Sequence, residues 1–460
     1  MEKNYLDHME GLTDETHIAV WGKEDTEITR FVLVNRATQH VTKYRVSSVR
    51  FRFAGVISTP EEIKFYIETK LPQGDPRLEL LTFVKKGEYF QQKVLDRETY
   101  MASFAQDGKF YRIRVDKKKD VLKVVVTNGT EADKVMEFPI TKSNLEKILR
   151  KEDFEFVPQG QAISYENGKS VNKIYVRGDV IYLISDGPED SSSGALVVMS
   201  LDTSTGKSDI RTVPWLNGDK REVKSGSSLA SPPPYMSPIS TVVNAGKMKH
   251  NSFLLGDQLF VFCFDNDLAA LSVHDVKTGE QIKLLPYPKG TPVAFKSSDL
   301  MQDEGSLETE WSEPKTEEAR AGKILKSLNK NGQPFIMVEP AAPYLRLIVG
   351  SRVYSIKQAS LMSPGVEHMA TGRAAAPFGT TNGTYVAVDY NYFYGYLMNS
   401  DLSAAPQSLK SHGPVDALNK RFAIVSKEIK AGKSGIIYDG AGVLLVYINK
   451  KTKEMVIEKV

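Results

Sequence analysis

Short segments of β-type sequence, either alternating apolar with polar residues or wholly apolar, follow one another along almost the whole chain. Clear examples lie at 64–68, 111–115, 180–184 and 443–448. Turn dipeptides such as Asn167-Gly168 separate them. On the order of thirty such segments occur, or about four in each stretch of roughly sixty residues. This pattern predicts an all-β fold built from repeated four-stranded sheets.

A second pattern marks the ends of several of these strands. An Asp or Asn is followed three residues later by Thr at 35–38, 96–99, 202–205, 275–278 and 449–452. The Asx side chain can accept hydrogen bonds from the backbone two and three residues on, which closes a tight turn between antiparallel strands. The same spacing at 209–212 lies in the middle of an expected strand, and we interpret it as chance. A recurring turn indicates one supersecondary unit used several times.

Two of the turns carry a longer similarity. The segments Ser-Leu-Asp-Thr-Ser-Thr-Gly-Lys at 200–207 and Val-His-Asp-Val-Lys-Thr-Gly-Glu at 273–280 resemble the strand–turn–strand of quinoprotein-like and related six- to eight-bladed β-propellers. In that fold, the resemblance implies, such a turn joins the two outer strands of a blade. The resemblance implies no activity, because the fold hosts many functions. Trp21, Trp215 and Trp311 occupy no repeated place, so we expect neither a quinone nor another cofactor.

Taken together, the patterns predict a single all-β propeller of about seven four-stranded blades over residues 1–460. We expect the N-terminal strand to pair with the C-terminal hairpin 443–458, because this closure leaves no exposed sheet edge. An alternative is two β domains joined at 214–240. The segment 299–332 is acidic up to 318, lacks a β pattern and is helical in its second half, so we expect an acidic and helical insertion on a blade.

Charge and hydropathy exclude several functions. The 460 residues contain 60 basic and 57 acidic ones, and a net charge of +3 without a basic cluster argues against a nucleic-acid partner. No apolar run is long enough for a membrane-spanning segment. The polar first twenty residues are no signal peptide, but they suit an exported bacterial protein whose leader has been removed. We therefore expect the periplasm or cell surface, and the cytoplasm if no leader was removed.

No sequence motif of catalysis or metal binding is present. The chain has no Gly-x-Ser-x-Gly, and its seven histidines never pair at the spacings of a local metal site, so we predict no catalytic residue and no metal ligand. Asp265 and Asp267 are interpreted as a tight turn, because no companion calcium ligands follow them. Cys263 lies in an apolar strand and is expected in the core. His274 follows a strand and is expected to face solvent.

Two features could form a ligand surface. In one unbroken strand, Tyr390, Tyr392, Tyr394 and Tyr396 would share a face and offer a platform for sugar rings or a planar ligand. Aromatic packing between blades, or a turn at Tyr390-Asn391, would instead make them structural. His250 begins an expected strand and could line the ligand face of a propeller.

These observations leave two hypotheses about function. The first is a non-enzymatic binding or protein-interaction propeller of the bacterial cell envelope, with a small-molecule or glycan ligand or a protein partner. It follows from the repeated architecture and the absence of a catalytic motif. The second is a hydrolase or lyase that acts on glycans or peptides, with acids and a histidine from several blades over the central channel. Carboxylates with perturbed pKa values around that channel would favour the enzyme.

Overall fold

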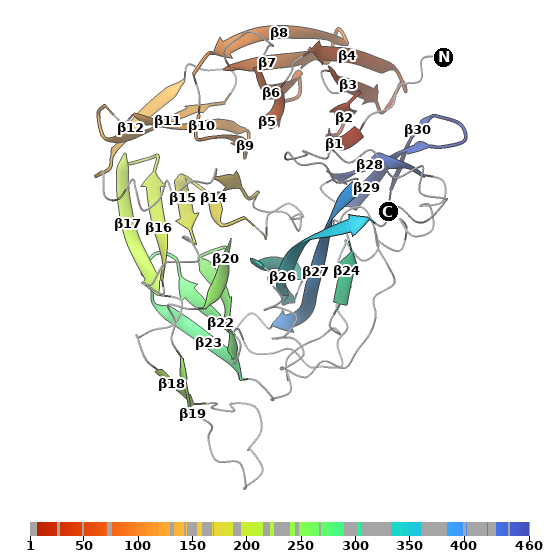
Figure 1. Ribbon diagram of the computed structural model, residues 1–460. Coiled ribbons are helices and arrows are strands. Elements are labelled where there is room, and N and C mark those ends of the chain that lie inside the picture. Colours follow the sequence, from red (N-terminus) through yellow and green to blue (C-terminus); the bar gives the residue numbers. More distant parts are fainter. Residues whose placement is uncertain are drawn as a thin grey trace.

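The sheets follow one another around a ring in chain order in the computed structural model, as a β-propeller does (Figure 1). The structure describes residues 7–24, 28–47, 50–70, 76–98, 100–116, 118–128, 133–141, 144, 154–158, 168, 170–186, 195–214, 221–224, 240–243, 248–265, 268–288, 301–304, 333–341, 343–359, 384–398, 402, 421, 429–439 and 442–459. For β18, β19, β24 and β27 the description covers the backbone only. The part of the chain that is described contains no helix whose length and hydropathy would let it cross a membrane.

The first three blades each use four consecutive antiparallel strands. Blade 1 is β1 (Asp7–Thr13), β2 (His17–Lys23), β3 (Ile28–Asn35) and β4 (Val41–Ser47). Blade 2 is β5 (Arg50–Ser58), β6 (Glu62–Lys70), β7 (Pro76–Val84) and β8 (Tyr89–Asp96). Blade 3 is β9 (Ala102–Gln106), β10 (Lys109–Asp116), β11 (Val121–Thr127) and β12 (Lys134–Pro139).

The next two blades repeat this plan with two additions. Blade 4 is β14 (Asn172–Arg177), β15 (Val180–Ser185), β16 (Ala195–Asp202) and β17 (Lys207–Pro214), and β13 (Glu155–Phe156) runs parallel to β14. A hairpin of β18 (Arg221–Lys224) and β19 (Ser240–Val243) follows. Blade 5 is β20 (Lys249–Leu255), β21 (Gln258–Phe264), β22 (Leu268–Asp275) and β23 (Gln281–Pro288).

The last two blades depart from strict chain order. Blade 6 has the spatial order β24-β27-β26-β25, and blade 7 has three strands among the described residues, with β1 beside β28. Their bounds are β24 (Met301–Glu304), β25 (Gln333–Ala341), β26 (Tyr344–Ala359), β27 (Thr384–Met398), β28 (Ile429–Asp439), β29 (Gly442–Asn449) and β30 (Met455–Lys459). β1 is antiparallel to β2 and parallel to β28, where Met9 pairs with Gly435.

The start of the expected acidic insertion is a strand. Met301–Glu304 forms β24 and pairs antiparallel with Tyr390–Phe393 of β27. The prediction that no β structure occurs in this acidic stretch was therefore wrong for these four residues. Backbone hydrogen bonding along the edge of β27 outweighs their weak β propensity. The rest of 299–332, with its expected helix, lies outside the described residues.

The hydrophobic core lies between neighbouring blades, because each sheet presents apolar side chains on both faces. Trp21 and Phe31 of blade 1 pack against Phe65 and Phe83 of blade 2. Tyr66 of blade 2 then stacks on Phe110 of blade 3, with ring centroids 3.8 Å apart. Further shared clusters join blades 3 and 4, blades 4, 5 and 6, and blades 7 and 1. Face-to-face packing of this kind fixes the angle of each blade to the next.

The repeated Asx turns explain how the outer hairpins close. Asn35 Oδ1 accepts the backbone N–H groups of Ala37 and Thr38 at 3.0 and 3.1 Å, and Thr38 Oγ1 accepts that of His40 at 3.3 Å. Asp202, Asp275 and Asn449 begin turns with the same contacts. All four turns join the third and fourth strands of a blade, or the last two strands of blade 7, as predicted.

The turn at Asp96 differs from the other four. Asp96 Oδ1 accepts the N–H groups of Arg97 and Glu98, but it follows the outermost strand of blade 2. The next strand, β9, belongs to blade 3. The prediction of a hairpin at 96–99 was therefore wrong, because an Asx turn can equally end a strand without reversing it onto a neighbour.

Candidate functional site

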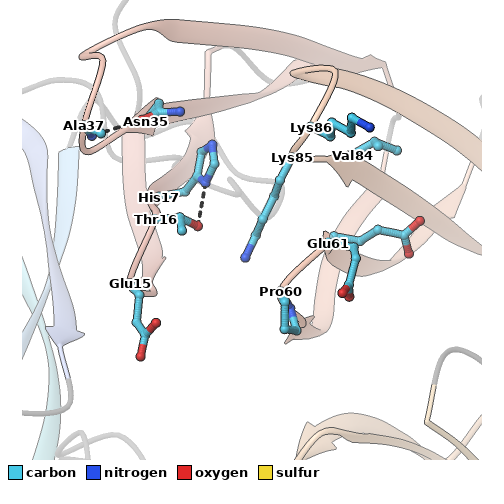
Figure 2. A pocket seen from close by; sticks show the side chains of 11 residues that line it. Glu15, Thr16, His17, Asn35, Ala37, Pro60, Glu61, Val84, Lys85 and Lys86 are labelled. Carbon is cyan, nitrogen blue, oxygen red and sulfur yellow. Dashed lines mark hydrogen bonds between the residues drawn. The ribbon is translucent and has the colours of Figure 1, made fainter.

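A pocket of about 640 Å³ opens between the hairpin turns of blades 1 and 2. Blade 1 contributes the turn between β1 and β2 and the turn between β3 and β4, and blade 2 contributes the two corresponding turns. Figure 2 shows Glu15, Thr16 and His17 on one side, facing Pro60, Glu61 and Lys85 on the other. The remaining lining residues are Asn35, Ala37, Glu62, Val84 and Lys86. We call this the blade 1–2 pocket.

One carboxylate holds the two blades together beside the pocket. Asp14 Oδ1 accepts the backbone N–H groups of Thr16 and His17, each at 2.8 Å, and so closes its own turn. Asp14 Oδ2 accepts the Ser58 hydroxyl at 2.6 Å and lies 2.9 Å from the Lys85 ammonium, both from blade 2. Partial burial alone would raise the pKa of Asp14, but these hydrogen bonds hold it well below its usual range.

The same carboxylate determines the tautomer of a buried histidine. The Thr16 hydroxyl lies 2.8 Å from Asp14 Oδ1 and must donate to it, because a carboxylate only accepts. His17 Nδ1 lies 2.9 Å from that hydroxyl oxygen, so Nδ1 carries the proton and donates. Nε2 is then a bare acceptor, buried and without a hydrogen-bond partner among the described residues. Burial also lowers the pKa of His17, which keeps the ring neutral.

The Lys85 ammonium is fully engaged at the edge of the pocket. Besides Asp14, it donates to the Thr59 carbonyl oxygen at 2.6 Å and to Ser58 Oγ at 3.4 Å. Its side chain is 9% exposed. A lysine saturated in this way positions the β5–β6 turn and offers no free amine for chemistry.

The charged groups that reach solvent at the pocket are Glu15, Glu61 and Lys86, all exposed. Glu15 and Glu61 come from different blades and stand on opposite sides in Figure 2. Among the described residues neither carboxylate forms an ion pair. The pocket therefore combines walls fixed by internal hydrogen bonds with acceptors that remain available to a ligand.

The structure places His250 elsewhere. It lies in β20, is 8% exposed, and its Nε2 donates to the backbone oxygen of Asp186 in blade 4. Burial lowers the pKa of His250, so the ring is neutral. His250 does not line the blade 1–2 pocket.

The four tyrosines lie in β27, and its backbone is unbroken there. Residues 384–398 pair continuously with β26, from Thr384 with Ala359 to Met398 with Leu345. No turn interrupts the strand at Tyr390-Asn391. The side chains of Tyr390, Tyr392, Tyr394 and Tyr396 lie outside the described residues, so their role as a ligand platform stays a prediction.

Two other side chains expected from sequence can be placed. Cys263 is fully buried as predicted, and burial raises the pKa of its thiol to about 12. His274 is also fully buried, and its Nε2 lies 3.0 Å from Ser272 Oγ. The prediction that His274 faces solvent was wrong, because β22 is covered by neighbouring blades on both faces.

Sequence reasoning did not identify Asp14, His17, Ser58 or Lys85. The one local signal was Asp14-Glu15-Thr16, an Asx turn that has Thr two residues on instead of three. Across the part of the chain that the structure describes, no group of His, Cys, Asp and Glu side chains could hold a metal ion. Asp265 Oδ1 accepts the N–H of Leu268 at 2.8 Å, as expected of a tight turn; Asp267 lies outside the described residues.

Comparison with known proteins identifies no family for this chain. No family model matches the chain, and no curated protein matches it. Similar solved structures include the β-propeller domain of the Trilobed protease from Pyrococcus furiosus, at 7% identity over 90% of this chain and 94% of that one, with a TM-score of 0.30. The WD40 domain of SCAP from fission yeast is 8% identical over 99% of this chain and 81% of that one, with a TM-score of 0.30. Neither likeness assigns an activity.

Proposed function

We propose that this protein is a non-enzymatic binding propeller that holds a small polar ligand in the blade 1–2 pocket. The observation that supports the proposal is the pocket itself. Its volume of about 640 Å³ lies in the usual range for small-molecule sites. Hydrogen bonds around Asp14 organise its walls in advance, which reduces the entropy lost on binding.

The polar groups of the pocket favour binding over catalysis. A serine nucleophile needs a base that receives its proton, yet the Ser58 hydroxyl donates to the Asp14 carboxylate. The low pKa of that carboxylate makes it a poor base. Lys85 is paired with Asp14, and the only lone pair of His17 is buried on Nε2. The groups that react in hydrolases thus serve here to hold the turns together.

The exposed groups indicate the class of ligand. Glu15 and Glu61 accept hydrogen bonds on two sides, and Lys86 donates. A neutral sugar or short oligosaccharide offers hydroxyl donors to both carboxylates and acceptors to the ammonium. The proposal therefore names a glycan fragment as the ligand, and the bacterial periplasm or cell surface as the place of action. Fractionation of producing cells tests the location.

Calorimetric titration and thermal shift against a panel of neutral oligosaccharides test the ligand. A true ligand at a hundredfold excess over its Kd stabilises the native state by about 2.7 kcal/mol. Glu15→Gln and Glu61→Gln should each weaken binding by roughly tenfold, since each loses a charge-assisted hydrogen bond. Glu454→Gln, an exposed carboxylate on the β29–β30 turn, is the matched control and should bind normally.

Two outcomes would contradict the proposal. If both pocket variants bind as the unmodified protein does, while Tyr392→Ala with Tyr394→Ala abolishes binding, the ligand lies on β27. If the oligosaccharide is cleaved during the titration, the protein is a hydrolase, and the second hypothesis from the sequence replaces the first.

A further inference from the structure

A second polar cluster is sealed inside the ring, where β14 of blade 4, β20 of blade 5 and β25 of blade 6 meet. It contains Lys173 of β14, Asp186 at the end of β15 and Asn251 of β20. All three residues have zero exposed surface. Ionisable side chains this deeply buried are rare, because removal from water disfavours their charged forms by several kcal/mol.

Three groups of complementary reactivity are in contact in this cluster. Lys173 Nζ lies 2.5 Å from Asn251 Oδ1, so it stands directly against the side-chain amide. Asp186 Oδ2 lies 3.6 Å from the same nitrogen. The other oxygen of this carboxyl group, Oδ1, is buried and has no hydrogen-bond partner among the described residues.

Each group is held in place by further contacts. Asp186 Oδ2 accepts the backbone N–H of Ser252 at 3.2 Å and its hydroxyl at 3.0 Å. Asn251 Nδ2 donates to the Pro334 carbonyl oxygen of β25 at 2.9 Å, which orients the amide with its oxygen toward Lys173. Lys173 also donates to the Ser170 carbonyl oxygen. A nucleophile and an electrophile fixed this way react at effective concentrations far above those in solution.

Burial also supplies the reactive form of the amine. Desolvation lowers the pKa of Lys173, against the opposing charges of Asp186 and Glu155. A larger share of neutral amine, the nucleophilic form, is therefore present than for a lysine in water.

We propose that Lys173 and Asn251 become joined by an intramolecular isopeptide bond, with Asp186 as the proton carrier. The lone pair of Nζ attacks Cγ of Asn251, the Nζ–Cγ bond forms, and the Cγ–Nδ2 bond breaks. One proton passes from Nζ to the departing nitrogen through the Asp186 carboxyl group, which ends in its starting state. Ammonia leaves, and no oxidant, nucleotide or metal takes part.

This bond would link blade 4 covalently to blade 5 across a separation of 78 residues. Such a cross-link reduces the number of conformations open to the unfolded chain, as a disulfide does. The sequence has a single cysteine, so the chain cannot form an intramolecular disulfide. The alternative is an unreacted ammonium that donates to Ser170, Asn251 and Asp186. The two states differ in covalent mass, so they can be separated without any variant.

Intact mass spectrometry of the purified, denatured full chain is the decisive experiment. The cross-linked chain is lighter than its sequence by one ammonia, and a protease digest yields one branched peptide joining the segments around 173 and 251. A chain of full sequence mass, with both segments recovered as separate linear peptides, overturns the proposal.

Variants then assign the roles. Asp186→Asn should leave a chain of full mass, because it lacks the proton carrier, and circular dichroism must show that it folds. Asn251→Asp should react with loss of one water instead of one ammonia. Asn172→Asp, at a buried neighbour outside the Lys173 contacts, is the control and should still lose one ammonia. Loss of ammonia from Asp186→Asn at the normal rate would remove Asp186 from the mechanism.

Discussion

Replacing Asp14 with Asn isolates the charge that joins blades 1 and 2. Asn keeps a side-chain oxygen that can accept the N–H groups of Thr16 and His17, so the turn itself is preserved. The substitution removes the negative charge facing Lys85, whose side chain is only 9% exposed. Breaking a buried ion pair costs about 3–5 kcal/mol. Because the Asp14 side chain is 18% exposed and Lys85 keeps its hydrogen bond to the Thr59 carbonyl oxygen, we expect the free energy of unfolding to fall by only about 2 kcal/mol.

Urea unfolding, monitored by tryptophan fluorescence, measures this loss of stability at the interface between blades 1 and 2. Trp21 is 4% exposed and stacks on Phe53 of blade 2, with ring centroids 4.4 Å apart, so its emission reports on the same interface. Trp215 and Trp311 are first replaced by Phe to leave this single probe. Glu15→Gln, which removes an exposed charge one residue away, is the matched control and should change stability by less than about 0.5 kcal/mol.

A double-mutant cycle with Lys85→Met separates the ion pair from other effects. If the pair carries the stability, the double variant should be about 1–2 kcal/mol more stable than the two single losses predict. The ion pair does not stabilise the fold if Asp14→Asn unfolds at the same urea concentration as Glu15→Gln, or if the two losses of stability simply add.

The pH dependence gives an independent check with a defined sign. The folded-state pKa of Asp14 lies below its unfolded value of about 3.9, so its contribution is complete well above that pH. It is lost progressively as the pH falls toward the folded-state value. The stability difference between the original protein and Asp14→Asn should therefore be constant near neutrality and shrink below about pH 4. A difference that grows on acidification would contradict the assigned interaction.

Four further predictions concern the turns and the core. Gln39 has φ 59°, so Gln39→Gly should raise the free energy of unfolding by up to about 1 kcal/mol. Gly206 has φ 71° and open space around it, so Gly206→Ala should lower the free energy of unfolding by about 1 kcal/mol. Thermal melting measures both changes. Thr278→Val should cost about 1 kcal/mol by removing the hydroxyl that accepts from Glu280, and no change in melting would contradict the role given to this Thr. Cys263 should resist alkylation at pH 8 in the folded chain, since burial raises its pKa to about 12, and react promptly in urea; rapid labelling of the native protein would refute this.

The parts of the fold that depend on local chemistry could be predicted from sequence. The turns at Asp202 and Asp275 are closed by contacts within six residues, so their sequence alone specifies them. The strand Met301–Glu304 was missed because its formation depends on β27, which is distant in the chain. His274 was misplaced for a related reason: whether a polar residue at a strand end is covered depends on the adjacent blades.

The candidate site was beyond local reasoning altogether. Asp14, Ser58 and Lys85 lie in three separate segments of the chain, and the packing of blade 1 against blade 2, which includes Trp21 against Phe65, brings these segments together. The Lys173–Asn251 contact likewise joins two blades. A single sequence shows which residue types could react or form pairs, but the packing of the blades determines which of these residues are in contact.

The pairing of β1 with β28 has a consequence for how the chain is made. Nearly the whole protein lies between Met9 and Gly435, so the ribosome releases blade 1 long before its partner strand exists. Early blades can fold one after another from short-range hairpins, but the edge of β1 stays uncovered throughout translation. An unpaired strand edge recruits other strands, including those of a second nascent chain. Ring completion is therefore the late step at which molecular chaperones would most improve the yield of folded protein.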